Sequence, residues 1–413
     1  MNIWSKKSEE EIKEKVFSAL KRNINYLDAN ILGVPGSYLD EKVFFHNASF
    51  LKDAPFLSTM LHNPNHIGCH TTGASESFFA GTHEIERELI EICAVDILKG
   101  APDSIDGYVA SGGTEANMQA IWIYRNQFMK EYGAKREEMV IITSQDNHYS
   151  MDKAGNILAI DVAKVAVDEN NRAIDQEKIQ DCIAAQKAKG KKYFIIVANM
   201  MTTMFGSVDS VDDYVAVLKA NEVQYRIHID GAYGGFYFPF SEENFQMGFN
   251  HPEISSVTLD AHKMAQAPYG TGIFLARKGL MQYATTMEAS YVEGEDCTLI
   301  GSRSGANAIS VWMILSKYGP YGWYEKIYIL QKRTEWFCEQ LAAMGVEYFR
   351  HPKSNLVTMR AKHLNEEIAQ KYGLVPDNHH EAKWFKVVIM EHVTVERLMP
   401  LVEDLKAYNP LEA

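Results

Sequence analysis

Short apolar segments alternate with amphipathic helical segments through the middle of the chain. Seven of the short segments are rich in β-branched and aromatic residues, and several are apolar throughout, which is typical of buried strands. A strand that is apolar on both faces needs cover on both faces, so the pattern predicts a mostly parallel seven-stranded sheet between two layers of helices. The predicted strands are 107–110, 139–143, 164–167, 193–198, 226–229, 256–259 and 272–276.

The two ends of the chain follow other patterns. Apolar residues recur every four positions from Ile12 to Ile24, behind a possible capping box at Ser8 and Glu11, and this predicts an amphipathic helix. Two helices (306–317, 321–344), two short strands (355–360, 385–390) and a closing helix (395–405) are expected near the C-terminus. We therefore predict an N-terminal helix and irregular covering segment over 1–80, a large domain over 81–305 and a small α+β domain over 306–413.

Composition and charge exclude several classes of protein. The chain has 46% hydrophobic residues, enough for a large core, and a net charge of −13, which repels nucleic acid. Its five cysteines are scattered without a C-x-x-C pair, which indicates a reducing, cytoplasmic setting. No apolar stretch has the roughly 18 residues of a membrane span, and charged residues stand where a signal peptide would be apolar. We expect a soluble protein with no membrane partner.

The first candidate site follows the predicted strand 107–110. Ser111-Gly112-Gly113-Thr114-Glu115-Ala116-Asn117 leads directly into a predicted helix, 118–130. Glycines at such a turn let backbone N–H groups converge on an anion at the positive end of the helix, as in a phosphate site. The segment is neither a P-loop nor a G-x-G-x-x-G fingerprint, and an ordinary tight turn is the alternative.

Two further strand ends carry ionisable residues. Asp230-Gly231-Ala232 follows strand 226–229, and Asp260-Ala261-His262-Lys263 follows strand 256–259. Alone, Asp230 could be a helix cap and Lys263 a solvated surface residue. Ligands bind at the carboxyl ends of the strands in such sheets, so these residues are expected to meet the anion site. A phosphorylated pyridine aldehyde needs a phosphate-binding site, an acid to pair with its ring nitrogen and an amine to form a Schiff base, and these segments offer all three.

These segments together resemble one enzyme family. Ser111 to Asn117, Asp230-Gly231-Ala232, Asp260-Ala261-His262-Lys263 and Gly301-Ser302-Arg303-Ser304-Gly305 stand in the order and spacing of the group II pyridoxal-phosphate-dependent amino-acid decarboxylases. The resemblance covers about residues 60 to 345 and continues more loosely beyond. It implies a type I aminotransferase-like α/β fold, pyridoxal 5'-phosphate as the cofactor, an L-amino acid as the substrate, and a homodimer with active sites at the subunit interface.

The resemblance also implies roles for single residues. Lys263 would hold the cofactor, Asp230 would keep the pyridine nitrogen protonated, and His148 and Ala232 would contact the two ring faces. Tyr291 would help to return a proton to Cα after decarboxylation. The residues implied to bind the cofactor are Gly113, Thr114, His148, Thr203, Asp230, Ala232, His262, Lys263 and Ser302, the last from the neighbouring subunit.

Two positions deserve separate mention. Family members usually have glycine where this chain has Met201, which is expected to narrow the pocket. His62, His66 and His70 repeat every four residues beside Cys69, as metal ligands on a helix might, but Pro64 argues against a single helical face. We expect no metal site, and by resemblance His66 is the expected substrate contact.

Three activities are compatible with these residues. Decarboxylation of an L-amino acid to its amine is the leading prediction. A carbon–carbon lyase of the sphingosine-phosphate lyase type is the alternative, because Gly-Ser-Arg-x-Gly, His-Lys and the stretch 267–272 resemble that group too. A cofactor-holding protein without turnover is the third, although such a protein would not need His148 and Tyr291.

Overall fold

The structure is a computed structural model in which residues 30, 32–33, 40, 42–43, 80–285 and 296–409 are described. The predicted N-terminal helix, His66, Tyr291 and the possible histidine ligands lie outside these residues. Of the described helices, none is both long enough and apolar enough to cross a membrane.

A seven-stranded sheet forms the larger part of the molecule, as predicted. Its spatial order is β1-β7-β6-β5-β4-β2-β3, and all pairs are parallel except those that β7 makes with β1 and β6. The strands are β1 (Ile105–Ala110), β2 (Met139–Ser144), β3 (Asp161–Val165), β4 (Tyr193–Asn199), β5 (Gln224–Gly231), β6 (Ile254–Asp260) and β7 (Gly272–Arg277).

One predicted strand was misplaced. We expected 164–167, but β3 covers Asp161–Val165 and pairs with Val140–Ser144 of β2. Because β3 is an edge strand that is mostly accessible, its pairing residues are not uniformly apolar, and the apolar pattern at 164–167 was a poor guide.

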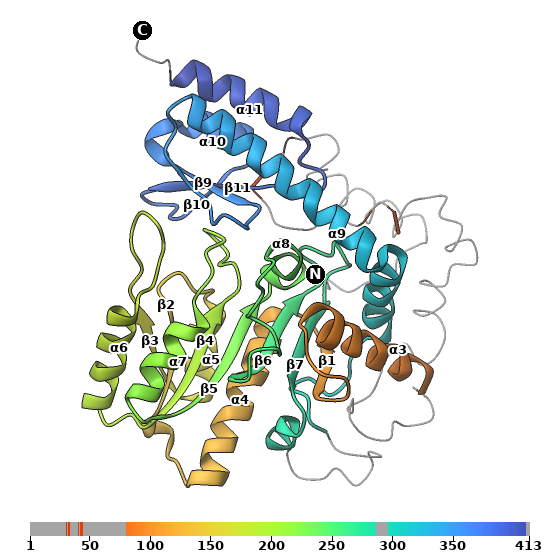
Figure 1. Ribbon diagram of the computed structural model, residues 1–413, viewed down its shortest axis with the longest axis vertical. Helices are drawn as coiled ribbons and strands as arrows, with labels where there is room; N and C mark the ends of the chain where they lie inside the picture. The colour runs from red at the N-terminus through yellow and green to blue at the C-terminus, as the bar shows by residue number, and fades with distance from the viewer. Residues whose placement is uncertain are drawn as a thin grey trace, which may run out of the picture.

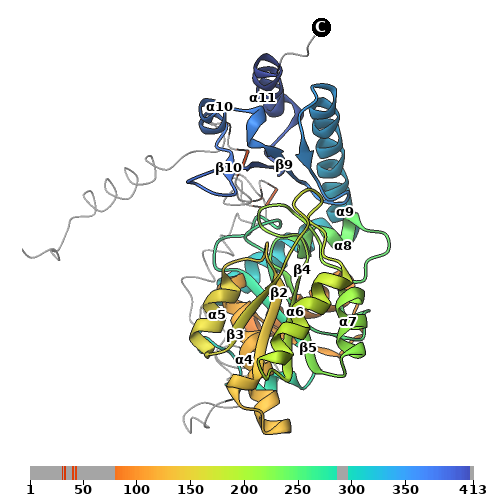
Figure 2. The ribbon, with the colours of Figure 1, turned by 90° about the vertical axis from the view of Figure 1, so that its left-hand side faces the viewer.

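Helices cover both faces of the large sheet. Figure 2 shows α4 (Gly113–Tyr132) and α5 (Ser150–Leu158) on one side and α6 (Gln176–Ala188) and α7 (Val211–Ala220) on the other. Alternate residues of the central strands enter two different cores: Ile141 and Ile195 pack with α4, while Val140 and Ile196 belong to the core that includes α6 and α7. Both faces of β2 and β4 are buried, which explains why these strands are mostly apolar.

A long kinked helix joins the two parts of the molecule. The two predicted helices 306–317 and 321–344 form one element, α9 (Gly305–Ala343), which is interrupted where Gly319 has φ 60° and ψ 176°. Pro320 follows and has no backbone N–H to donate, so the kink lies where the sequence breaks the helical pattern. Helix α3 (Ala80–Glu91), with the π-helical turn Ile92–Ile97, packs against α9.

A second, antiparallel sheet forms the smaller part of the molecule. Its order is β10-β11-β9-β8, and Figure 1 shows it with α10 and α11 at the opposite end of α9 from α3. The elements are β8 (Tyr348–Phe349), β9 (Leu356–Arg360), α10 (Glu366–Lys371), β10 (Val375–Pro376), β11 (Trp384–Val388) and α11 (Val395–Tyr408). Strands β8 and β10 and helix α10 were not predicted, because each is too short to show a period.

The remaining elements are short. They are the 3-10 helices Arg136–Glu138, Gly234–Phe236, Leu280–Ala284 and Ala361–His363, and the single-turn helix α8 (Phe238–Ser241).

Candidate active site

The turn between β1 and α4 lines a cavity of about 320 Å³. Ser111, Gly112, Gly113 and Thr114 form one wall of it, at the N-terminus of α4, where unpaired N–H groups favour an anion. A Cβ at Gly113 would lie 2.8 Å from Asp260 Oδ2 and 3.0 Å from Ala232 Cβ, so a side chain at this position would displace its neighbours. The cavity is in the size range of small-molecule sites.

Lys263 stands in the turn after β6 and faces the same cavity. Its Nζ lies 3.1 Å from Oδ2 of Asp260, a carboxylate that is 3% exposed. This places an amine and a potential proton acceptor together in a partly desolvated cleft.

His262 lies next to this pair. Its ring stacks on that of Tyr269 with centroids 5.0 Å apart, and its Nε2 lies 3.6 Å from Oδ2 of Asp260. Burial lowers the pKa of His262, and the charge of Asp260 opposes this only in part. Nδ1 is buried and has no hydrogen-bond partner among the described residues.

Asp230 is the penultimate residue of β5 and lines a second, narrower cleft that adjoins the first. Its Oδ2 accepts a hydrogen bond from Nδ2 of Asn117 at 2.9 Å, and its Oδ1 accepts one from the backbone N–H of Ala232 at 3.1 Å. The two clefts share His148, Ala232 and Lys263. The acid, the amine and the anion cradle therefore surround one space.

His148 follows β2 in the loop before α5. The backbone N–H of Ser150 donates to its Nδ1 at 3.2 Å, which leaves Nε2 as the protonated nitrogen of the neutral ring. Burial lowers the pKa of His148, and the nearby charge of Asp230 counteracts part of this effect. The imidazole is thus uncharged at neutral pH.

The structure brings most of the predicted site residues together. The predicted residues that line one or both clefts are Gly113, Thr114, His148, Thr203, Asp230, Ala232, His262 and Lys263. Ser302 is exposed and lines neither cleft within one chain. Tyr291 and His66 lie outside the described residues, so their places stay predictions.

Met201 lines the narrow cleft with its backbone in the left-handed region, at φ 68°. Its side chain is buried at 3% exposure and meets the close approach of Gly234, where an added Cβ would come within 3.0 Å of Met201 Cβ. The left-handed backbone gives a physical reason for the glycine that is usual at this position.

Lys386 is a residue of this region that we did not predict. It lies on β11 of the small sheet with 4% exposure, and its Nζ donates to the carbonyl oxygen of Thr203 at 2.9 Å. No carboxylate of the described residues forms a salt bridge with it. Burial, with a smaller contribution from Lys263, lowers its pKa to about 8. The only signal in the sequence was one charge inside an otherwise apolar strand, 384–388.

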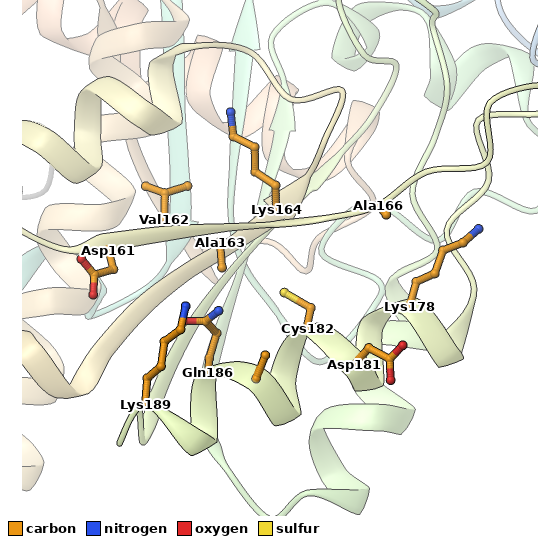
Figure 3. Close-up of a pocket in the computed structure, with 11 residues that line it drawn as sticks. Asp161, Val162, Ala163, Lys164, Ala166, Lys178, Asp181, Cys182, Gln186 and Lys189 are labelled. Carbon is orange, nitrogen blue, oxygen red and sulfur yellow. The ribbon is translucent and has the colours of Figure 1, made fainter.

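A larger groove of about 660 Å³ lies elsewhere, between the edge strand β3 and helix α6. Figure 3 shows Cys182 pointing from α6 toward the strand, with Lys178 and Lys189 along the helix side. Burial raises the pKa of the Cys182 thiol, which makes it a poor nucleophile. None of the predicted site residues lines this groove.

The sequence profile of one family matches the chain over residues 84–362, and this family is described as the pyridoxal-dependent decarboxylase conserved domain. A tryptophan decarboxylase of Clostridium sporogenes is 48% identical over 410 residues, which are 99% of this chain and 98% of that protein. A probable L-tyrosine/L-aspartate decarboxylase of Methanocella arvoryzae is 30% identical over 369 residues, covering 86% of this chain and 94% of that one.

Solved structures share the fold at low sequence identity. The L-methionine decarboxylase of Streptomyces sp. 590 superposes with a TM-score of 0.78 at 19% identity, covering 98% of this chain and 96% of that one. A sphingosine-1-phosphate lyase of Burkholderia pseudomallei gives 0.80 at 17% identity, covering 99% and 92%. The fold is therefore common to both reactions predicted above, whereas the family match and the 48% identical relative favour decarboxylation. This chain belongs to the pyridoxal-dependent decarboxylases.

Proposed function

We propose that this decarboxylase acts on L-tryptophan and releases tryptamine and carbon dioxide. The observation that supports this substrate is the 48% identity, over 99% of the chain, to a tryptophan decarboxylase. Other relatives are named for tyrosine, aspartate and histidine, and they share 30% identity or less.

The described residues fit pyridoxal phosphate as the cofactor. The cradle at Gly113 and Thr114 and the unpartnered Nδ1 of His262 would hold its phosphate, while Thr203 would contact the ring substituents. When bound, the cofactor supplies an aldehyde that condenses with amines and a ring that accepts the electron pair left at Cα when carbon dioxide departs. Lys263 would be the amine that holds it, since it is the lysine lining both clefts.

Each neighbouring side chain would then have a defined task. Asp230, fixed by Asn117 and Ala232, would hold the proton of the ring nitrogen through a charge-assisted hydrogen bond. The neutral imidazole of His148 would lie against one ring face and the methyl of Ala232 against the other. Asp260 would accept the proton that Lys263 must lose before its amine can react.

Lys386 would bind the carboxylate of the substrate. A buried ammonium group with one carbonyl partner has two further N–H donors to satisfy, and an anion meets that need better than water. Its partner Thr203 lines the cleft together with Lys263, so the carboxylate would be held above the cofactor ring. The fixed carboxylate sets which Cα bond is broken, because the bond that breaks must stand perpendicular to the ring.

The substrate is tested by product analysis. The protein loaded with pyridoxal phosphate is incubated with each of the twenty amino acids, and released carbon dioxide and amine are measured. We expect tryptophan to give the highest kcat/KM and tryptamine as the amine. Lys263→Ala is the control and should release none. Faster turnover of a non-aromatic amino acid would contradict the proposed substrate, and an aldehyde from a sphingoid base phosphate would favour the lyase alternative.

Tyr291 and His66 complete the proposed site. Tyr291 would return a proton to Cα after carbon dioxide leaves, and His66 would contact the substrate. Tyr291→Phe should therefore keep the bound cofactor, seen by its visible absorbance, while the rate of amine release falls.

We further propose a cytoplasmic homodimer with its active sites at the subunit interface. Ser302 is exposed on the segment just before α9, as a residue serving a neighbouring subunit would be. Cys93, Cys182 and Cys338 are free thiols, in keeping with a reducing compartment. Sedimentation equilibrium should give about twice the chain mass of 46.7 kDa; a stable monomer with full activity would contradict the dimer.

A further inference from the structure

A buried chain of hydrogen bonds runs from Asp230 into the interior of the large sheet. Asp230 Oδ2 is bound by Nδ2 of Asn117, and Oδ1 of the same amide lies 2.9 Å from Nε2 of His228. Nδ1 of His228 lies 2.6 Å from Oγ of Ser256, which is hydrogen-bonded in turn to the hydroxyl of Tyr124. The last four residues are at most 1% exposed. Bulk water therefore cannot replace these bonds.

The chemistry of each group fixes the direction of the chain. An ionised carboxylate only accepts hydrogen bonds, so the NH₂ group of Asn117 must face Asp230 and its oxygen must face His228. His228 must then carry its proton on Nε2, and its Nδ1 must accept from Ser256. Ser256 is left to accept from Tyr124. Every donor in the chain points toward Asp230.

His228 needs only the proton on Nε2 to donate to Asn117, and the hydroxyl of Ser256 can donate to its unprotonated Nδ1. Burial lowers the pKa of His228 to about 4, and the charge of Asp230 and a backbone hydrogen bond with Ser256 offset this only in part. A second contact of Nε2, with Oγ1 of Thr258, is longer at 3.2 Å and is secondary. At neutral pH the ring is therefore an uncharged donor to Asn117.

Rigid elements carry all members of the chain. Asn117 and Tyr124 belong to α4, His228 to β5 and Ser256 to β6, and β5 pairs with β6 along the sheet. The arrangement cannot shift without displacing the core, so the orientation of the Asn117 amide is set in advance of ligand binding.

We propose that Asn117 and His228 are positioning residues that hold Asp230 as an oriented anion and so keep the proton on the ring nitrogen of the cofactor. This inference rests on the proposed role of Asp230. The two N–H donors on Asp230 stabilise its negative charge, which makes the carboxylate a weaker competitor for the proton that it shares with the ring nitrogen. Without His228 the oxygen of the Asn117 amide would lose its donor, and only the 3.1 Å bond of Nδ2 to Ser150 Oγ would help to orient the group that donates to Asp230.

Other ionisable groups face Asp230 as well. His148, from the loop between β2 and α5, responds to its charge, and Lys263 lines the same cleft from the turn after β6. Asn117 is the residue that is hydrogen-bonded to both Asp230 and His228, so changes at His228 reach Asp230 through its amide as well as through the direct charge interaction.

The test uses three variants of the full chain, each loaded with pyridoxal phosphate labelled with ¹⁵N in its ring. His228→Leu removes the donor to Asn117, and His228→Gln keeps an amide that can donate to it. Thr258→Val removes only the longer contact to the same imidazole nitrogen. The ¹⁵N shift of the ring nitrogen is followed from pH 6 to 10, and the dissociation constant of the cofactor is measured by equilibrium dialysis.

We expect the protonated fraction of the ring nitrogen to be lower in His228→Leu than in the wild type across this pH range, because a carboxylate with one donor fewer competes more strongly for the shared proton. Cofactor binding should be about tenfold weaker, as for the loss of one hydrogen bond to a charged group. For both quantities, His228→Gln should give values between those of His228→Leu and the wild type. Thr258→Val should match the wild type. Unchanged titration in a folded His228→Leu protein, or an equal shift in Thr258→Val, would overturn the proposal.

A second measurement does not depend on a folded leucine variant. The ¹⁵N shifts of His228 in the wild type should show the neutral Nε2–H tautomer from pH 5 to 9, and an Nδ1–H tautomer would overturn the proposed direction of the chain. A wild type with a protonated ring nitrogen but no release of carbon dioxide from tryptophan would contradict the proposed substrate and still support the role of His228.

Discussion

At Met201 the backbone conformation favours glycine, whereas the packing favours a large side chain. The left-handed backbone, at φ 68°, favours glycine, whereas the buried side chain contributes packing beside the narrow cleft. Methionine at this position therefore adds backbone strain in exchange for a filled space next to the substrate.

Met201→Ala and Met201→Gly separate these two effects. Both variants lose the side chain, but only glycine relieves the left-handed strain, so Met201→Gly should be the more stable by about 1 kcal/mol. This reverses the usual order, in which alanine is more stable than glycine. Thermal unfolding of the cofactor-free variants measures it, and a higher Tm for Met201→Ala would contradict the strain. Both variants should accept a wider range of amino acids than the wild type.

The lowered pKa of Lys386 predicts that the KM for the substrate depends on pH. Its ammonium, with a pKa of about 8 in the free protein, is present below pH 8 and lost above it, while the substrate carboxylate stays ionised. The KM for tryptophan should therefore rise as the pH increases through 8. The inhibition constant of tryptamine, which has no carboxylate, should not follow this ionisation of Lys386.

Substitution of Lys386 tests the same contact at fixed pH. Lys386→Met should raise the KM for tryptophan by about ten- to a hundredfold, the worth of a charge-assisted hydrogen bond, and leave inhibition by tryptamine unchanged. Lys383→Met is the matched control, because Lys383 is exposed and three residues earlier in the chain. Equal weakening of both ligands by Lys386→Met would show that the residue supports the fold and does not bind the carboxylate.

Residues at strand ends were predictable, whereas residues from distant parts of the chain were not. Asp230 and Lys263 could be predicted because parallel strands deliver their carboxyl ends to one edge of the sheet. Lys386 comes from the other sheet, more than a hundred positions later in the sequence, and is hydrogen-bonded to Thr203, which lines the narrow cleft. Only the packing of the two sheets reveals that proximity, and no spacing rule describes it.

Among the elements, a buried ion pair joins α3 to the segment before α9. Arg303 binds both carboxylate oxygens of Glu86, and both side chains are at most 3% exposed. Glu86 also accepts the backbone N–H of Val109 at 2.7 Å, in the strand that leads to the cradle. The pair thus fixes the position of β1 just before the anion site.

Removing one member of this ion pair should lower the free energy of unfolding. Glu86→Gln leaves the buried guanidinium without its counter-charge and should destabilise the fold by about 3–5 kcal/mol, whereas Glu86→Leu combined with Arg303→Met should cost much less. Chemical unfolding of the cofactor-free protein measures both. A double variant as unstable as Glu86→Gln would show that the packing of these side chains matters more than their charges.

Long periodic elements were predictable from the sequence, and short or interrupted ones were not. The central strands β2 and β4 carry uninterrupted apolar runs because both faces are buried. Strand β3 has an exposed edge, and β8 and β10 have two residues each, so their pairing depends on neighbours that the local sequence does not specify. The kink of α9 coincided with Gly319 and Pro320, where the sequence itself breaks the helix.

For the molecule as a whole, the site depends on the contact between the two sheets. The large sheet supplies Asp230, Lys263 and the anion cradle, and the small sheet supplies Lys386 through its bond to Thr203. Figure 1 shows α9 extending along both parts, which links their positions through one element. A decarboxylase needs its site enclosed between such parts, because the reacting carboxylate must be oriented and water must be excluded.

The most direct test of this account is the position at which the cofactor is held. Protein loaded with pyridoxal phosphate is reduced with borohydride, digested, and the modified lysine is identified by mass spectrometry. We predict a single modified residue, Lys263. Modification at Lys386 or at a surface lysine instead, with Lys263 unmodified, would contradict the account.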